Sequence, residues 1–293
     1  MMLSQSQIDE RAEKAFARLE SCDLCPRNCG VNRIDGELGF CRTGRQALLS
    51  SYGPHFGEEP PLVGSHGSGT IFFAGCNLGC IFCQNYDLSH LLHGVPTTAL
   101  ELAGVTLELQ RRGCHNINFV SPSHVAAQIL EALPAAYDGG LRIPLVYNCG
   151  GYDSIETLKL LDGLMDIYMP DAKYSDEKSA MELSSAPNYP AVMKQALKEM
   201  HRQVGDLEID ERGIAKRGMI IRHLVLPGGL AGTEEIMHFI ARDLSVDSYV
   251  NIMEQYHPVY KAFDHRLINR RITRTEYLEA LDMARAQGLH RGF

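Results

Sequence analysis

Six short apolar runs, each followed by an amphipathic stretch, occupy the chain from residue 70 onward. The runs predict β-strands at residues 70–75, 116–121, 143–148, 166–171, 219–226 and 249–253. The amphipathic stretches predict helices near residues 97–112, 123–136, 154–163, 190–204, 233–243 and 273–287. Strands that alternate with helices predict a parallel sheet covered by helices, because parallel neighbours need a crossover connection. Most of the runs are almost continuously apolar, as expected for strands covered on both faces.

The first 69 residues lack this alternation. Residues 1–20 predict a short amphipathic helix, residues 21–45 are rich in cysteine, glycine and arginine, and residues 46–69 predict a loop with room for one short strand. We therefore expect three parts: a cysteine-rich extension (1–69), an α/β partial (β/α)6 TIM-like barrel of parallel strands (70–260) and a C-terminal helical extension (261–293). Such barrels carry their chemistry at the C-terminal ends of the strands.

The composition narrows the setting of this chemistry. Of 293 residues, 45% are hydrophobic and 22% charged, and the formal net charge is −8. This acidic balance gives no reason to expect a nucleic-acid partner. No apolar run approaches the roughly 18 residues that a membrane span needs, and the polar N-terminus lacks the apolar core of a signal peptide. We therefore expect a cytoplasmic protein without a membrane partner.

Nine cysteines are many for such a chain, and an odd number without an export signal predicts metal or cluster ligation rather than disulfides. Cys76, Cys80 and Cys83 follow the first predicted strand with C-x3-C-x2-C spacing. Three thiolates on one loop can bind three irons of a [4Fe–4S] cubane and leave the fourth iron open. The alternative is a zinc site, for which His90 or His93 would supply the fourth ligand.

This loop, with the aromatic Phe82 before the third cysteine, resembles the signature of the radical S-adenosylmethionine (SAM) superfamily. The resemblance implies that SAM chelates the open iron and is cleaved reductively to a 5′-deoxyadenosyl radical, which abstracts hydrogen from a substrate. Over residues 70–260 the chain is most similar to the pyruvate formate-lyase activating enzymes. It looks closest to an uncharacterised activating-enzyme-like branch that also carries an N-terminal cysteine cluster.

The resemblance also implies which residues contact SAM. Asp171 and Lys173 resemble the D-x-K element of the activating enzymes, with a surface ion pair as the ordinary alternative. A lysine suits the SAM carboxylate and an acid suits the ribose hydroxyls. The usual glycine-glycine-acid element for the SAM amino group is missing. The remaining candidates for SAM contacts are Phe82, Asn118, Ser121, Asn148, Arg222 and His257. For Arg222 and His257, packing inside the protein is the alternative role.

A second cysteine group lies near the N-terminus. Cys22, Cys25, Cys29 and Cys41 have C-x2-C-x3-C-x11-C spacing, and four thiolates suit either a second [4Fe–4S] cluster or a zinc ion. The two single cysteines, Cys114 and Cys149, are expected to be small buried residues, although Cys149 could also be a thiol that quenches a radical. The nearby arginines, expected to be solvated, are Arg27, Arg33, Arg42 and Arg45.

Glu58 and Glu59 are expected to be solvated, unless their segment caps the barrel mouth. The function implied by the resemblance is an oxidoreductase that activates a glycyl radical enzyme, with flavodoxin or ferredoxin as electron donor. Modification of a small molecule or peptide is the alternative. A non-catalytic iron–sulfur or zinc scaffold fits less well, because a scaffold needs no SAM contacts at the ends of separate strands.

Overall fold

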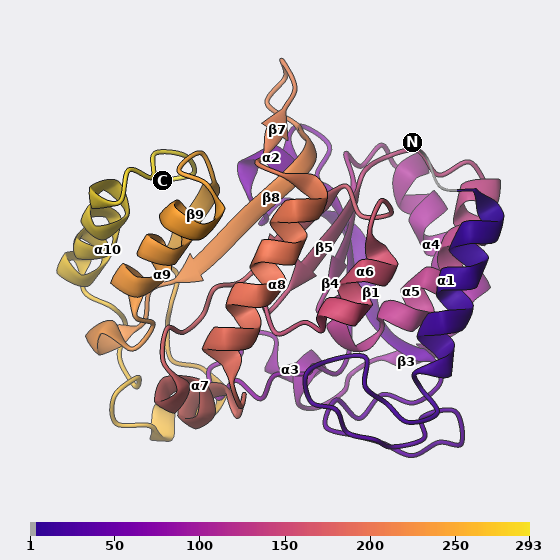
Figure 1. Ribbon diagram of the computed structural model, residues 1–293, viewed down its shortest axis with the longest axis horizontal. Coiled ribbons are helices and arrows are strands. Elements are labelled where there is room, and N and C mark those ends of the chain that lie inside the picture. Colours follow the sequence, from indigo (N-terminus) through magenta and orange to yellow (C-terminus); the bar gives the residue numbers. More distant parts are fainter. Residues whose placement is uncertain (1–3) are drawn as a thin grey trace.

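The computed structural model describes residues 4–293 and contains a sheet with six parallel strands at its centre (Figure 1). These are β2 (Ser68–Phe73), β4 (Ile117–Val120), β5 (Leu145–Cys149), β6 (Ile167–Pro170), β8 (Ala215–Leu224) and β9 (Tyr249–Met253). They pair in that order, and within the described residues no pairing joins β9 back to β2. All six predicted strands and the partial barrel are thus confirmed.

Three further strands extend this sheet in the antiparallel sense. They are β1 (Ala47–His55) on β2, β3 (Val95–Thr97) on β1, and β7 (Glu208–Ile209) on β8. The expectation of at most one short strand between residues 46 and 69 underestimated β1, which is nine residues long. The apolar pattern is weak there because the second half of β1 is mostly solvent-exposed.

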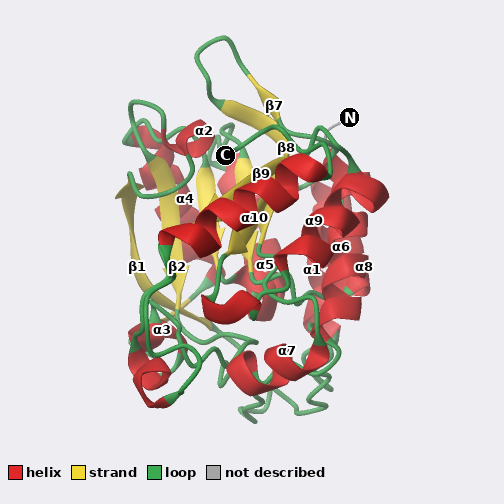
Figure 2. Ribbon diagram, turned by 90° about the vertical axis from the view of Figure 1, so that its left-hand side faces the viewer, coloured by secondary structure: helices red, strands yellow, loops and turns green. Residues whose placement is uncertain are grey.

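Helices cover the outer face of the parallel strands (Figures 1 and 2). They are α1 (Gln5–Ala17), α4 (Ala99–Arg111), α5 (Ala126–Asp138), α6 (Ile155–Leu161), α8 (Tyr189–Val204), α9 (Thr233–Phe239) and α10 (Arg274–Ala286). Capping boxes at Ser4, Thr98 and Thr273 fix where α1, α4 and α10 begin. The start of the predicted N-terminal helix, at residues 1–3, lies outside the described residues.

The other helical segments lie in the connections. Three are α-helices, namely α2 (Pro60–Val63), α3 (Tyr86–Ser89) and α7 (Glu177–Ser184). Three are 3₁₀ turns at Pro122–His124, Pro227–Gly229 and Tyr260–Asp264, and a π-helical turn at Ile240–Leu244 continues α9. In residues 4–293 no helix is both long and apolar enough to cross a bilayer.

The two ends of the barrel are covered differently. Figure 1 shows α2 and β7 at one end, and α3 and α7 at the other. His55, at the end of β1, pairs with Ser68 at the start of β2, so the segment that follows β1 lies at the amino ends of the parallel strands. There Leu62 of α2 is fully buried against side chains from inside the barrel, including Val146, Ile167, Met169 and Ile220. The amino end of the barrel is therefore closed by α2, and its carboxyl end carries the cysteine loop.

Candidate cluster and cofactor site

The three-cysteine loop follows β2 directly and is held by hydrogen bonds to the end of α7 and to Tyr152. The amides of Gly79 and Ile81 donate to Ser184 and Leu183 at the end of α7, at 2.9 Å each. The buried Asn77 donates from Nδ2 to the Tyr152 carbonyl at 2.6 Å. These contacts give a fixed loop conformation at the carboxyl ends of the strands.

Each cysteine sulfur of this loop accepts a hydrogen bond. The donors are the Leu78 amide to Cys76 (3.4 Å), the Ser184 hydroxyl to Cys80 (2.9 Å) and the Ser89 hydroxyl to Cys83 (3.2 Å). Burial, reinforced by the neighbouring cysteines, raises the pKa of Cys76 to about 12 and also raises the pKa of Cys83. The thiols of Cys76 and Cys83 therefore hold their protons until a cation displaces them.

These features fit an anionic iron–thiolate group. Hydrogen bonds to the sulfurs stabilise thiolate ligands and tune a cluster, and Lys173 lies near enough to lower the pKa of Cys76 and Cys83. A cavity of about 320 Å³ opens beside Cys76 and is lined in addition by Phe40, Arg42, Leu78, Gly79, Ser89, His90 and Tyr260. The loop thus has three sulfur ligands and an adjacent cavity that could admit a bound group.

Neither histidine of the zinc alternative joins the cysteines. His90 directs Nε2 to the Cys80 carbonyl oxygen at 3.0 Å and stacks on Tyr260. Among residues 4–293, no three or more side chains of His, Cys, Asp and Glu lie close enough together to hold a single metal ion.

Asp171, Lys173, Asn148 and Arg222 come together from three strand ends. Arg222 donates from Nε to Asp171 (2.8 Å) and from Nη2 to Asn148 (2.7 Å), and Lys173 Nζ lies 2.5 Å from Asp171. Burial alone would raise the pKa of Asp171, but Arg222 and Lys173 hold it below its usual value. The residues expected to contact SAM therefore form one charged network inside the barrel. The Asp171–Lys173 ion pair of the alternative is present but lies largely buried rather than on the surface, and a role in SAM binding stays a prediction.

The other expected SAM contacts are less closely grouped. Asn118 is fully buried, and neither side-chain atom has a hydrogen-bond partner among the described residues. Ser121 has a left-handed backbone, with its amide bonded to the Asn148 carbonyl at 2.9 Å. Phe82 packs edge-on against Tyr256. The imidazole Nδ1 of His257 lies 3.1 Å from the Gln255 carbonyl oxygen, in a partly exposed position.

Glu58 and Glu59 are not solvated, which corrects that expectation. Their side chains are 9% and 4% exposed, and they approach Arg222 at 3.8 and 4.0 Å. They reach it from the amino end of the barrel, because Glu59 directly precedes α2. Glu59 also accepts a hydrogen bond from Asn251 of β9 at 3.0 Å. Sequence alone gave only one hint of this placement, namely two acids beside two prolines.

Glu58→Gln is expected to change how stability depends on pH. Burial, strengthened by Glu59 and Asp171 and opposed by Arg222, raises the pKa of Glu58 from 4.5 to about 7. Between these values the folded protein binds more protons than the unfolded chain, so this carboxyl lowers stability as pH rises. Between pH 6 and 8 the free energy of unfolding is expected to fall by about 1 kcal/mol less in the variant than in the wild type, as measured by urea denaturation. Equal losses in both proteins would contradict the burial of this charge, and Glu131→Gln is the exposed control.

The N-terminal cysteines also lie together. Cys22, Cys29 and Cys41 all act on the pKa of Cys25, which burial raises to about 12. Arg33 was expected to be solvated but is 1% exposed. Its guanidinium donates to the carbonyls of Gly44 and His124 and lies 3.7 Å from the Cys22 sulfur. This arginine therefore ties the N-terminal cysteine group to the barrel.

The two cysteine groups are neighbours. Arg27 donates from Nε to the Asn77 carbonyl at 2.8 Å, and both Cys25 and Cys76 influence its pKa, which burial lowers. A Cβ added to Gly75 would lie 2.7 Å from the Cys41 carbonyl oxygen, and Gly75 has φ +85°. Only glycine permits this approach without strain. The N-terminal group thus packs directly on the three-cysteine loop.

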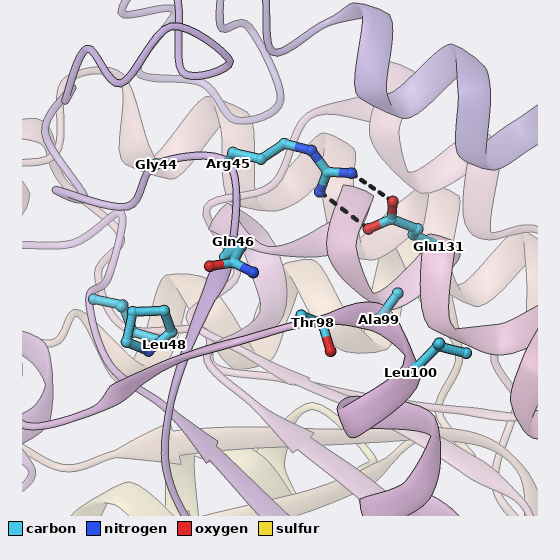
Figure 3. Close-up of a pocket in the computed structure, with 9 residues that line it drawn as sticks. Gly44, Arg45, Gln46, Leu48, Thr98, Ala99, Leu100 and Glu131 are labelled. Atoms are coloured by element: carbon cyan, nitrogen blue, oxygen red, sulfur yellow. Dashed lines mark hydrogen bonds and ion pairs between the residues drawn. The ribbon is translucent and has the colours of Figure 1, made fainter.

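Two cysteines and one cavity take no part in either cysteine group. Cys114 and Cys149 are buried, as expected for small packing residues. A cavity of about 650 Å³ lies on the outside of the barrel, where Arg45 and Glu131 form a double hydrogen bond at 2.6 and 3.1 Å (Figure 3). Its lining contains no cysteine or histidine, so we assign no chemistry to it.

Comparison with known proteins identifies one relative by sequence and one solved structure with a similar fold. No family model matches the chain. Among solved structures, the chain is similar to HydG, a maturase of the [FeFe]-hydrogenase, with a TM-score of 0.50 and 11% identity. That match covers 74% of this chain and 48% of HydG, so it spans about half of HydG and shows the fold alone. The chain is 36% identical over 292 residues to the uncharacterized protein MJ0674 of Methanocaldococcus jannaschii, covering 96% of this chain and 79% of the relative. The chain therefore belongs to the same family as MJ0674.

Proposed function

We propose that this protein is a radical SAM enzyme. The observation that carries the proposal is the position of Cys76, Cys80 and Cys83 at the carboxyl end of the first parallel strand, beside the network of Asp171, Lys173 and Arg222. The likeness of the fold to HydG and the C-x3-C-x2-C spacing point the same way. The cysteines and the charged network come from the ends of different strands. A SAM molecule that ligates the cluster and contacts the network would explain why both lie at the same place.

Each residue has a defined task in this proposal. Cys76, Cys80 and Cys83 hold a [4Fe–4S] cluster, which supplies the electron for reductive cleavage of SAM when it is bound. Lys173 offers its ammonium to the SAM carboxylate, and Asp171 accepts hydrogen bonds from the ribose hydroxyls. Arg222 orients Asp171 through the contact at 2.8 Å. The unpaired amide of Asn118 offers both a donor and an acceptor to the cofactor.

For the N-terminal group we propose a second [4Fe–4S] cluster rather than zinc. Thiolates around one zinc ion, at Zn–S distances of about 2.3 Å, would lie within about 4 Å of one another. The pair Cys25-Pro26 resembles the cysteine–proline pair of iron–sulfur motifs, which favours the cluster. In a cubane each thiolate binds a different iron, so the sulfurs stand farther apart. Thiolate-bound clusters need a reducing compartment, which supports a cytoplasmic location.

The substrate class has two candidates. Resemblance to the activating enzymes suggests a glycyl radical enzyme as partner, with flavodoxin or ferredoxin as electron donor. The structure offers a specific reason to consider a small molecule or peptide as well. The amino end of the barrel is closed by α2, and the interior above it contains Glu58, Glu59 and Arg222. A charged interior that is closed at its amino end favours a small polar group at that depth over an extended protein loop.

Anaerobic reconstitution tests the proposed function and the N-terminal metal together. We expect iron and acid-labile sulfide for two [4Fe–4S] clusters per chain, with zinc far below one equivalent. With dithionite and SAM, the protein is expected to release 5′-deoxyadenosine. Release of none by a fully loaded protein would overturn the radical SAM assignment. One equivalent of zinc, with iron for a single cluster, would overturn the second cluster only.

A further inference from the structure

We propose that Glu58 and Glu59 form a recognition site for a positively charged group, an ammonium or a guanidinium, of a ligand bound inside the barrel. This inference rests on the proposed function, because it concerns the ligands that lie beside the cluster. It assigns a role to a segment before the first barrel strand, where neither the cysteine motif nor the expected SAM contacts lie.

Unsatisfied polar atoms point to a missing ligand at this place. Within the described residues, Glu59 Oε2 is buried without a hydrogen-bond partner, and so are Oδ1 and Nδ2 of Asn118. The Asn118 amide lies beside the Glu58 carboxyl and lowers its pKa as a hydrogen-bond donor, so Nδ2 has a neighbour that can accept from it. Among the described residues, the oppositely charged partner of Glu58 is Arg222, at 3.8 Å. Buried polar groups are normally hydrogen-bonded, so the two remaining unpaired acceptors, Glu59 Oε2 and Asn118 Oδ1, indicate a place that a ligand with donor groups fills.

The network has an excess of negative charge, which a cation could neutralise. In ionised form, Glu58, Glu59 and Asp171 carry three negative charges, against two positive charges on Arg222 and Lys173. Asp171 already engages both cations, at 2.5 and 2.8 Å. The two glutamates are left with contacts of 3.8 and 4.0 Å to the single guanidinium of Arg222. A further positive group would balance the site and supply the missing donors.

A ligand can reach this place from solvent. The side chains of Glu58, Asp171, Lys173 and Arg222 retain 9%, 14%, 16% and 18% of their accessible surface although they lie inside the barrel. Lys173 influences the cysteine thiols of the loop, whereas the glutamates meet the network at Arg222. The carboxylates therefore lie on the far side of the network from the cluster ligands.

Two molecules could bring such a group, namely SAM, through its amino group, or a separate substrate that bears an amine or guanidine. The test uses methylguanidinium as probe and the neutral, equally planar N-methylurea as matched control ligand. Their affinities for the reconstituted protein are measured anaerobically by saturation-transfer NMR, without SAM and without reductant, so that the site is free whichever molecule normally fills it. The variants are Glu58→Gln and Glu59→Gln, and the control variant is Glu131→Gln, which removes a carboxylate on the outside of the barrel. Iron content and melting temperature establish that each variant is folded and loaded.

We expect the wild type and the Glu131→Gln variant to prefer methylguanidinium over N-methylurea by about tenfold or more, since a charged hydrogen bond contributes roughly 1.5–3 kcal/mol, where 1.4 kcal/mol is tenfold. The preference is expected to vanish in Glu59→Gln and weaken in Glu58→Gln. SAM affinity, measured by equilibrium dialysis on the same variants, identifies the source. A tenfold loss in both variants assigns the cation to SAM itself, and unchanged SAM affinity assigns it to a separate substrate.

No preference in the wild type, or an equal preference in the folded glutamine variants, would overturn the site. Release of 5′-deoxyadenosine by the wild type is measured in parallel. If the wild type releases it but shows no cation preference, the carboxylate site is wrong and the proposed function stands. If the wild type shows the preference but cleaves no SAM, the proposed chemistry is wrong and the carboxylates bind a cation for another purpose.

Discussion

Replacement of Cys76, Cys80 or Cys83 by alanine is expected to reduce SAM cleavage by about a thousandfold or more, equivalent to at least ~4 kcal/mol of activation free energy. Each thiolate would hold a different iron of the same cluster, so the loss of one ligand exposes that iron and prevents stable assembly. The sulfurs already accept separate hydrogen bonds, from the Leu78 amide and from the hydroxyls of Ser184 and Ser89. The nearby His90 is not placed to substitute, since its Nε2 faces the Cys80 carbonyl oxygen.

The measurement is 5′-deoxyadenosine formation under dithionite, together with iron content and the EPR signal of the reduced protein. Cys114→Ala is the matched control, because Cys114 is a buried thiol outside both cysteine groups. This control is expected to keep its iron and its activity. In the loop variants, iron should fall by the content of one cluster while the N-terminal group stays loaded. A loop variant with wild-type cleavage would show that its cysteine is not a required ligand.

The barrel could be predicted from sequence because its strands are short, apolar and regularly alternated with helices. All six predicted strands appear within a few residues of their expected bounds. Strand β1 was underestimated because it lies at the side of the sheet and buries only Ala47 and Leu49 fully. The alternation of apolar and polar residues reflects which side chains are buried. A strand that is largely exposed therefore shows little apolar pattern in its sequence. The short helix α2 was missed for a different reason, since four residues are too few to show a period of 3.6.

The chemistry was predictable where residues close in sequence act together. The cysteine spacing and the D-x-K element are local patterns, and the structure brings Asp171, Lys173, Asn148 and Arg222 into one network. Contacts between distant segments could not be read in this way. Arg33 and Glu59 look like ordinary surface charges until the fold buries them against partners. The packing of Gly75 on Cys41 likewise depends on a contact across 34 residues.

Arg222→Ala is expected to destabilise the folded protein by roughly 3–5 kcal/mol at pH 8, the cost of leaving buried charges uncompensated. The guanidinium binds Asp171 and Asn148 and faces Glu58 and Glu59. Without it, three carboxylates would share the single charge of Lys173. Arg222→Lys keeps a charge but cannot bridge Asp171 and Asn148 with one planar group, so it should recover only part of the loss.

The pH dependence of this loss separates charge from packing. The carboxyl of Glu58 has a pKa of about 7 beside Arg222, and removal of the guanidinium raises that pKa further. At pH 6 the variant can take up a proton there and relieve part of the repulsion, so its loss of stability should be smaller than at pH 8. Urea denaturation at both pH values measures this difference. Arg285→Ala, which removes an exposed ion pair with Asp282, is expected to cost less than about 1 kcal/mol at either pH. If the loss of stability in Arg222→Ala were the same at both pH values, the arginine would act by filling space. The carboxylates around it would then not depend on its charge.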